Sequence, residues 1–172
     1  MTDTKHPEAL RLPVLQLLEY LMSNVRYEDG SLFWTTSVQG RKAGSMLGCV
    51  DNRGYVRAEI LRRKYAVHRL VFLMHNGWLP VFVDHIDGNP SNNRIENLRA
   101  CSKNQNACNS KTRADSSIGV KGVCFHKASG KWSASATYQG KRWQKVFPTI
   151  EEAAAASAAM RELMHKEFAR HK

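Results

Sequence analysis

Apolar and polar positions follow two different periods along the first part of the chain. Residues 13–23 place apolar side chains three and four positions apart, which predicts a short packing helix. Residues 31–67 instead contain short extended runs broken by glycines, and this pattern predicts a small antiparallel sheet. From His68 the helical spacing returns, and Gly77 is a residue at which such a helix commonly ends. The pattern therefore predicts a helix, a sheet and a second helix.

A hairpin followed by a helix is predicted next. Residues 81–85 form a short apolar strand that ends in two polar side chains. Residues 87–90 have the composition of a turn, and a second strand is expected at residues 95–100. The sequence S-x-x-Q then has the spacing of a capping box, which predicts a polar helix over residues 102–111.

The last part of the chain shows three runs of alternating character separated by glycine turns, which predict three antiparallel strands. A capping box of the form T-x-x-E opens an alanine-rich stretch at Thr149, and we expect one long helix that covers this sheet. The expected fold class is α+β. The expected domains are an N-terminal helix and basic sheet region at residues 1–66, a hairpin and helix at residues 67–111, a linker at residues 112–118, and a three-stranded domain at residues 119–172.

The charge of the chain points to a polyanionic partner. Its 172 residues include 26 Lys plus Arg against 15 Asp plus Glu, a net charge of +11. Residues 39–69 carry eight basic and two acidic side chains, and residues 111–145 carry eight basic and one acidic. Two separate basic stretches with interleaved aromatic residues favour nucleic acid over a merely solvated surface.

Membrane and secreted classes are not expected. No run approaches the roughly 18 consecutive apolar residues of a membrane-spanning helix, and the first residues do not have the layout of a secretory signal. The four cysteines contain no C-x-x-C pair, which argues against a zinc ribbon or a disulfide framework. We expect a reduced, cytoplasmic protein.

Four polar residues form the candidate catalytic set: Asp84 and His85 end the first strand of the predicted hairpin, Asn97 lies on its second strand, and Asn106 lies on the helix that follows. A hard divalent cation prefers oxygen ligands, so the carboxylate of Asp84, the amide oxygen of Asn106 and a substrate phosphate form a sufficient site. His85 is then expected to take a proton from the attacking water, and the amide of Asn97 to orient its ring. The expected cofactor is one divalent metal ion, magnesium, for which manganese can substitute.

This region resembles the HNH homing endonucleases that are common in phages. The resemblance rests on the motifs HRLV, DHIDGN and NNRIENLR and on the asparagine at position 106. It implies a ββα-metal finger that cuts a phosphodiester bond with one divalent metal. The match makes His85 the first histidine of the motif and Asn97 its asparagine. Asn106 stands in place of the second histidine, a departure common in the group, and the resemblance implies a metal held by Asp84 and Asn106.

The C-terminal segment resembles the Apetala-type domain of plant ethylene-response factors. The motifs GVKGV, GKW, GKRW and FPT carry this likeness. In that domain a three-stranded sheet lies in the DNA major groove, which implies contact roles for Lys121, Lys141 and Trp143. Cys124 and His126 stand where the plant domain has arginines, so the sequence that would be read is not implied.

Double-stranded DNA is the expected partner, bound by a monomer without a membrane. The residues expected to contact DNA come from both basic stretches: Arg41, Lys42, Arg57, Lys121, Lys127, Lys141, Arg142, Trp143 and Lys145.

The favoured function is a metal-dependent DNA endonuclease of the phage homing type that nicks one strand. One alternative is a DNA-binding regulator that uses the Apetala-type domain and keeps the finger as a scaffold. Another is an RNA-binding or structural protein, although a sheet that reads the major groove suits B-DNA better than A-form RNA. The candidate polar residues favour the enzyme, because a scaffold has no need of polar groups that converge at a strand end.

Overall fold

The computed structural model describes residues 11–37, 40–110 and 118–169, so most of the predicted linker at residues 112–118 lies outside the described part. The chain forms two compact units, residues 1–100 and 101–172, and each is described by itself. The division assigns the helix expected at residues 102–111 to the C-terminal unit. Among the described residues, no helix is both long and apolar enough to cross a membrane.

The N-terminal unit contains two helices and three small sheets, paired as β1-β2, β3-β4-β5 and β6-β7. Its elements are α1 (Arg11–Asn24), β1 (Val25–Glu28), β2 (Ser31–Trp34), β3 (Cys49–Val50), β4 (Val56–Ile60), β5 (Arg63–Ala66), α2 (Val67–Asn76), β6 (Phe82–His85), the 3-10 turn η2 (Ile95–Asn97) and β7 (Leu98–Cys101).

Apolar side chains of α1, β2 and α2 meet in the core of this unit. Leu21, Leu32, Leu70 and Leu73 are fully buried there, and Trp34 is nearly so. The first two turns of α2 are enclosed on several sides, since Val67, His68, Leu70, Val71, Phe72 and Leu73 are all buried. The core therefore fixes α2 as the platform on which the rest of the unit packs.

Most predicted elements of this unit are confirmed, with three differences. The strands β1 and β3 were not predicted, and the single expected sheet is divided into a hairpin and a separate three-stranded sheet. The second strand of the hairpin begins only at Leu98, because residues 95–97 form a 3-10 turn. Asn97 was predicted to lie on the second strand, but it lies at the end of this 3-10 turn. Gly77 ends α2 in the left-handed conformation, as expected (φ 73°).

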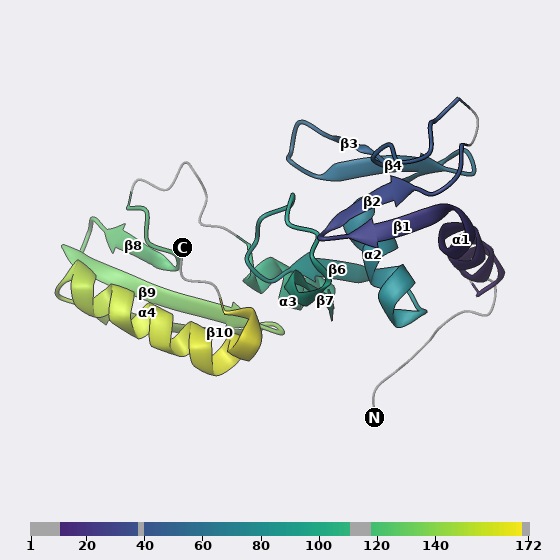
Figure 1. Cartoon of the computed structure of the whole chain (residues 1–172). Coiled ribbons are helices and arrows are strands. Elements are labelled where there is room, and N and C mark those ends of the chain that lie inside the picture. Colours follow the sequence, from purple (N-terminus) through teal and green to yellow (C-terminus); the bar gives the residue numbers. More distant parts are fainter. Residues whose placement is uncertain (1–10, 38–39, 111–117, 170–172) are drawn as a thin grey trace. The chain divides into compact units, whose positions relative to one another are not determined.

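The C-terminal unit is a three-stranded antiparallel sheet in the order β10-β9-β8, covered by one helix. Figure 1 shows α4 running along the sheet. The elements are α3 (Lys103–Cys108), β8 (Val123–His126), β9 (Lys131–Tyr138), β10 (Lys141–Phe147), α4 (Ile150–His165) and the 3-10 turn η3 (Lys166–Phe168). The predicted α+β class is confirmed.

Caps and small residues explain the form of this unit. The capping box predicted at Ser102 is present, with both reciprocal hydrogen bonds to Gln105, although α3 ends at Cys108, before the predicted boundary. Ala134 of β9 and Ala153 of α4 have no exposed surface. Side chains this small allow the helix to approach the sheet closely, which is the packing role expected of the alanines.

Candidate active site

β6 brings two ionisable side chains into the interior of the N-terminal unit. Asp84 and His85 are its last two residues, and they expose only 6% and 5% of their surfaces. Arg69 of α2 anchors the start of this strand, since its guanidinium donates to the carbonyl oxygens of Pro80 (3.0 Å) and Val81 (2.9 Å). Buried polar groups are costly unless they are paired, so Asp84 and His85 need partners inside the protein.

Arg99 on the neighbouring strand β7 is a partner of Asp84. Its Nε and Nη2 atoms lie 3.0 and 2.9 Å from the same carboxylate oxygen, Oδ2. The side chains are 16% exposed for Arg99 and 7% exposed for Asp84. Removing either charge would leave the other buried without this counter-charge, so the pair is mutually required.

Asn93 is a partner of His85. The His85 Nε2 atom lies 2.9 Å from Oδ1 of Asn93, which is itself only 2% exposed. Because an amide oxygen accepts, Nε2 is the donor of this bond, and the neutral ring then carries its lone pair on Nδ1. The hydrogen bond thus determines which ring nitrogen of a neutral His85 can accept a proton, namely Nδ1.

Asn97 shapes the loop that joins β6 to β7. Its Nδ2 atom donates to Oδ1 of Asp87 (2.9 Å) and to the carbonyl oxygen of Asn92 (2.8 Å), and its Oδ1 accepts from the Asp87 amide (3.0 Å). Burial raises the pKa of Asp87, but hydrogen bonds from Asn89, Asn92 and Asn97 outweigh it and hold that pKa below its usual value. The loop is therefore tied around an ionised carboxylate.

The N-terminal hairpin and sheet hold this loop from outside. The Tyr27 hydroxyl accepts from the backbone amide of Ile95 (3.2 Å), and a Cβ at Gly30 would lie only 3.0 Å from the backbone nitrogen of Arg94. The Ser91 hydroxyl donates to a carbonyl oxygen in the turn between β3 and β4 (2.8 Å). The region that precedes the finger thereby supports the segment that carries Asn93.

His68 on α2 packs its ring against His85. The two ring centroids are 4.8 Å apart, at an interplanar angle of 64°. Burial, and after it the charges of the nearby His85, Arg69 and Arg57, lower the pKa of His68 to about 3. Its Nδ1 atom is buried without a hydrogen-bond partner. His68 is thus a neutral neighbour of His85 near the start of α2.

Comparisons with known proteins match this part of the chain to a protein family. Residues 65–108 match the family model of the HNH endonucleases. The chain is also 33% identical to Protein 3.8 of Escherichia phage T7 over 105 residues, which cover 60% of this chain and 87% of that protein. The chain belongs to the HNH endonuclease family. It is 34% identical over 110 residues to the Uncharacterized HNH endonuclease L560 of Acanthamoeba polyphaga mimivirus, covering 62% of this chain and 56% of that protein.

No solved structure matched the chain. The family match ends at residue 108, so the Apetala-type likeness of residues 119–172 stays a prediction.

The structure places the predicted residues of the HNH domain in two groups. Asp84 and His85 end β6, in agreement with the strand predicted there, and both are buried. The side chain of Asn97 bonds to the loop, and Asn93 is the amide that reaches His85. Asn106 is exposed on α3, which belongs to the other unit, so its position relative to Asp84 stays a prediction.

The donor set suits a hard cation. Within residues 11–37, 40–110 and 118–169, no group of three or more His, Cys, Asp or Glu side chains is placed to hold a metal ion. A site of the expected kind needs fewer protein ligands, because magnesium usually retains several waters and binds one or two carboxylates together with substrate phosphate. The carboxylate of Asp84 meets this requirement, with Oδ2 directed to Arg99.

The basic residues predicted to contact DNA in the N-terminal unit are exposed. Arg41 donates to the carbonyl oxygen of Glu59 (3.0 Å), and Arg57 donates to Oδ2 of Asp51 (3.0 Å). Lys42 is exposed beside Arg41 in the chain. All three positions are open to a partner, and their DNA contacts stay predictions.

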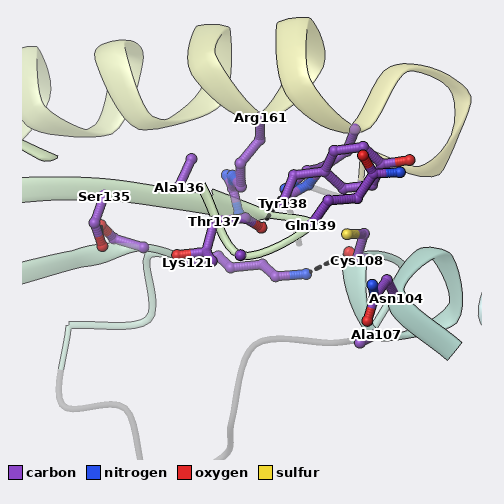
Figure 2. A pocket seen from close by; sticks show the side chains of 13 residues that line it. Asn104, Ala107, Cys108, Lys121, Ser135, Ala136, Thr137, Tyr138, Gln139 and Arg161 are labelled. Carbon is purple, nitrogen blue, oxygen red and sulfur yellow. Dashed lines mark hydrogen bonds between the residues drawn. The ribbon is translucent and has the colours of Figure 1, made fainter. Parts of the chain in front are cut away.

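Lys121 in the C-terminal unit has a different environment from the one expected. Its ammonium donates to the carbonyl oxygens of Cys108 (2.8 Å) and Ser110 (2.6 Å) at the end of α3. Figure 2 shows Lys121 reaching toward Cys108 along the wall of a pocket. This side chain therefore ties α3 to the sheet domain. Three other predicted contact residues are exposed: Lys127, Lys141 and Lys145.

The strand register decides the direction of Trp143. Trp143 pairs with Ala136 and packs against the cluster that includes Ala153 of α4, so it lies on the helix side of the sheet. Arg142 pairs with Thr137 on the opposite, open side, and both are exposed. The DNA contact expected for Trp143 stays a prediction, and Arg142 is the predicted contact residue that the open side presents.

Asn93, Arg99 and His68 are the site residues that sequence reasoning did not assign to the chemistry. Asn93 stood in a run of asparagines that turn composition explained equally well. Arg99 lies in the motif NNRIENLR, to which no role in the chemistry was assigned, and it pairs with Asp84. One signal available in the sequence was the pair of polar residues that ends an apolar strand, since polar groups that become buried there require partners.

The low pKa of His68 predicts an acid-sensitive domain. Between pH 6.5 and about 3 the unfolded chain binds a proton at His68 that the folded chain does not bind. Stability is therefore complete above pH 6.5 and falls with decreasing pH, by at most about 1.4 kcal/mol per pH unit. In His68→Gln, chemical unfolding followed across this range should show a shallower fall. His75→Gln on the same helix is the control, and equal slopes for His68→Gln and wild type would contradict the assignment.

Proposed function

We propose that this HNH endonuclease hydrolyses phosphodiester bonds of double-stranded DNA with one divalent metal ion, with His85 as the general base. The observation that carries the proposal is the buried imidazole of His85, held at Nε2 by Asn93 beside the buried carboxylate of Asp84. His85 Nδ1 takes a proton from water as the water oxygen bonds to phosphorus, and the bond from phosphorus to the leaving oxygen breaks. A general base needs this fixed orientation and a neutral ring.

The metal is assigned to Asp84 and Asn106, as magnesium or, in its place, manganese. When bound, it would stabilise negative charge on the phosphate and on the leaving oxygen. Support for Asp84 comes from its burial at the strand end, next to His85. Support for Asn106 comes from the resemblance alone, in which the amide replaces the second histidine of the motif.

A single finger acts on one phosphodiester bond at a time, which favours a monomer that nicks one strand. The homing character of the enzyme rests on the likeness to phage endonucleases. The phage relative and the mimivirus relative are compatible with this proposal.

The C-terminal unit is proposed to bind DNA through the open side of its sheet. Helix α4 covers one side, and the other side presents Lys131 and Arg142 together with short polar side chains. A sheet of this width with a cationic open face is suited to the major groove of B-DNA. Arg41, Lys42 and Arg57 of the N-terminal unit are proposed to contact phosphates.

Replacement of His85 tests the chemistry. In His85→Ala, nicking of supercoiled plasmid should fall by roughly two to four orders of magnitude, because the base is lost, while DNA affinity persists. Wild-type nicking should require magnesium and stop with EDTA. His75→Ala, at an exposed position of α2, is the matched control and should cut normally. Cleavage that continues in EDTA, or in His85→Ala at the wild-type rate, would refute the proposal.

The metal ligands behave differently from the base in the same assay. Asp84→Ala and Asn106→Ala should recover part of their activity at high magnesium, because they lose affinity for the ion and not the base. Asn97→Ala should show a smaller loss than His85→Ala. Normal cleavage by Asn106→Ala at low magnesium would remove Asn106 from the metal site.

The salt dependence of DNA affinity tests whether the open side of the sheet contacts DNA. Each phosphate contact that is lost should reduce the log-log slope of affinity against salt by about 0.9. Arg142→Gln should therefore flatten the slope, measured by fluorescence anisotropy on a duplex across a salt series. Thr137→Ala, which changes an uncharged neighbour on the same side, should leave the slope unchanged. An unchanged slope in Arg142→Gln would show that this arginine does not neutralise a phosphate.

A further inference from the structure

Arg99 is hydrogen-bonded to the carboxylate of Asp84, which the proposed function assigns to the metal. Both of its hydrogen bonds to Asp84 end on one oxygen, at 3.0 and 2.9 Å. The pair is largely withdrawn from water, with 16% and 7% of the side chains exposed. A dication that binds this carboxylate meets a guanidinium charge at close range, with little water to screen the repulsion.

The chemistry of the Arg99 guanidinium indicates which anion it can bind once a metal ion takes its place on Asp84. Arginine presents a planar fork of donors that matches carboxylate and phosphate equally well. The phosphodiester to be cut must lie beside the metal, and it gains a second negative charge as water adds to phosphorus. A cation next to Asp84 is therefore next to the position where this charge develops.

We propose that Arg99 is a phosphate-binding residue that is held by Asp84 in the metal-free protein and exchanges this carboxylate for the scissile phosphate when metal and DNA bind. The inference rests on the proposed function, because it requires Asp84 to be a metal ligand. The ion pair keeps the buried site neutral before the metal arrives, and the exchange keeps Arg99 paired afterwards. Arg99 and the metal compete for Asp84 when DNA is absent.

The closing experiment measures Mn²⁺ binding to the full chain without DNA, by isothermal titration calorimetry. Arg99→Gln should bind Mn²⁺ about 3 to 30 times more tightly than wild type, because the competing cation is gone. Arg99→Lys keeps a positive charge and should stay within about threefold of wild type. Arg94→Gln is the matched control, since Arg94 pairs with Asp29 on the surface (58% and 70% exposed) and its loss should leave Mn²⁺ affinity unchanged.

Cleavage gives the second readout. At saturating metal, Arg99→Gln should nick plasmid roughly 10 to 1,000 times more slowly than wild type, and Arg99→Lys should recover part of this loss. The combination of tighter metal and slower cleavage distinguishes an exchange from a structural role, because a distorted site would lose both.

The outcomes separate this inference from the proposed function. If Asp84→Asn binds Mn²⁺ as wild type does, Asp84 is not the metal ligand and both proposals lose their metal site. If Asp84→Asn loses Mn²⁺ but Arg99→Gln does not gain affinity, the metal site stands and the exchange is wrong. Should Arg99→Gln not fold, as judged by circular dichroism, the lysine variant decides: a rise in its Mn²⁺ affinity above threefold would contradict charge competition.

Discussion

The burial of ionisable and polar side chains at the end of β6 is the constraint on which the N-terminal unit depends. Asp84, His85 and Asn93 lie almost wholly out of water, and apart from them and His68 the buried core of the unit is apolar. Each would destabilise the fold if its partner were missing, so Arg99 and Asn93 are required by the same placement that makes Asp84 and His85 useful. A strand end built only for stability would carry apolar side chains in these positions.

The elements that surround the strand end follow from this requirement. The hydrogen bond from Asn93 to His85 is reliable only if the loop that carries Asn93 is rigid. Asp87 and Asn97 tie that loop from within, and the Tyr27 hydroxyl and the close approach of Gly30 hold it from outside. The region before the HNH domain thus has a structural task, besides the DNA contacts proposed for its basic residues.

The sequence was sufficient to predict most of the elements, although not β1 and β3, and to place two polar residues at the end of β6. Helical spacing predicted α2, a capping box followed by good helix formers predicted α4, and an apolar run that ends in Asp84 and His85 predicted β6. The partners could not be predicted, because which of several neighbouring asparagines reaches His85 depends on how the loop folds back. Trp143 illustrates the same limit, since a shift of one position in register turns a strand residue to the other face of the sheet.

A double-mutant cycle on cleavage tests the central claim, that His85 is a general base and that Asn93 acts on catalysis through it. The cleavage rates of wild type, His85→Ala, Asn93→Ala and the double variant would be compared at saturating magnesium, each scaled to its folded fraction. If Asn93 serves only to orient His85, the double variant should cut no more than about threefold more slowly than His85→Ala alone. If the loss of rate in the double variant equals the product of the losses in the two single variants, the two side chains act independently. That result would contradict the account.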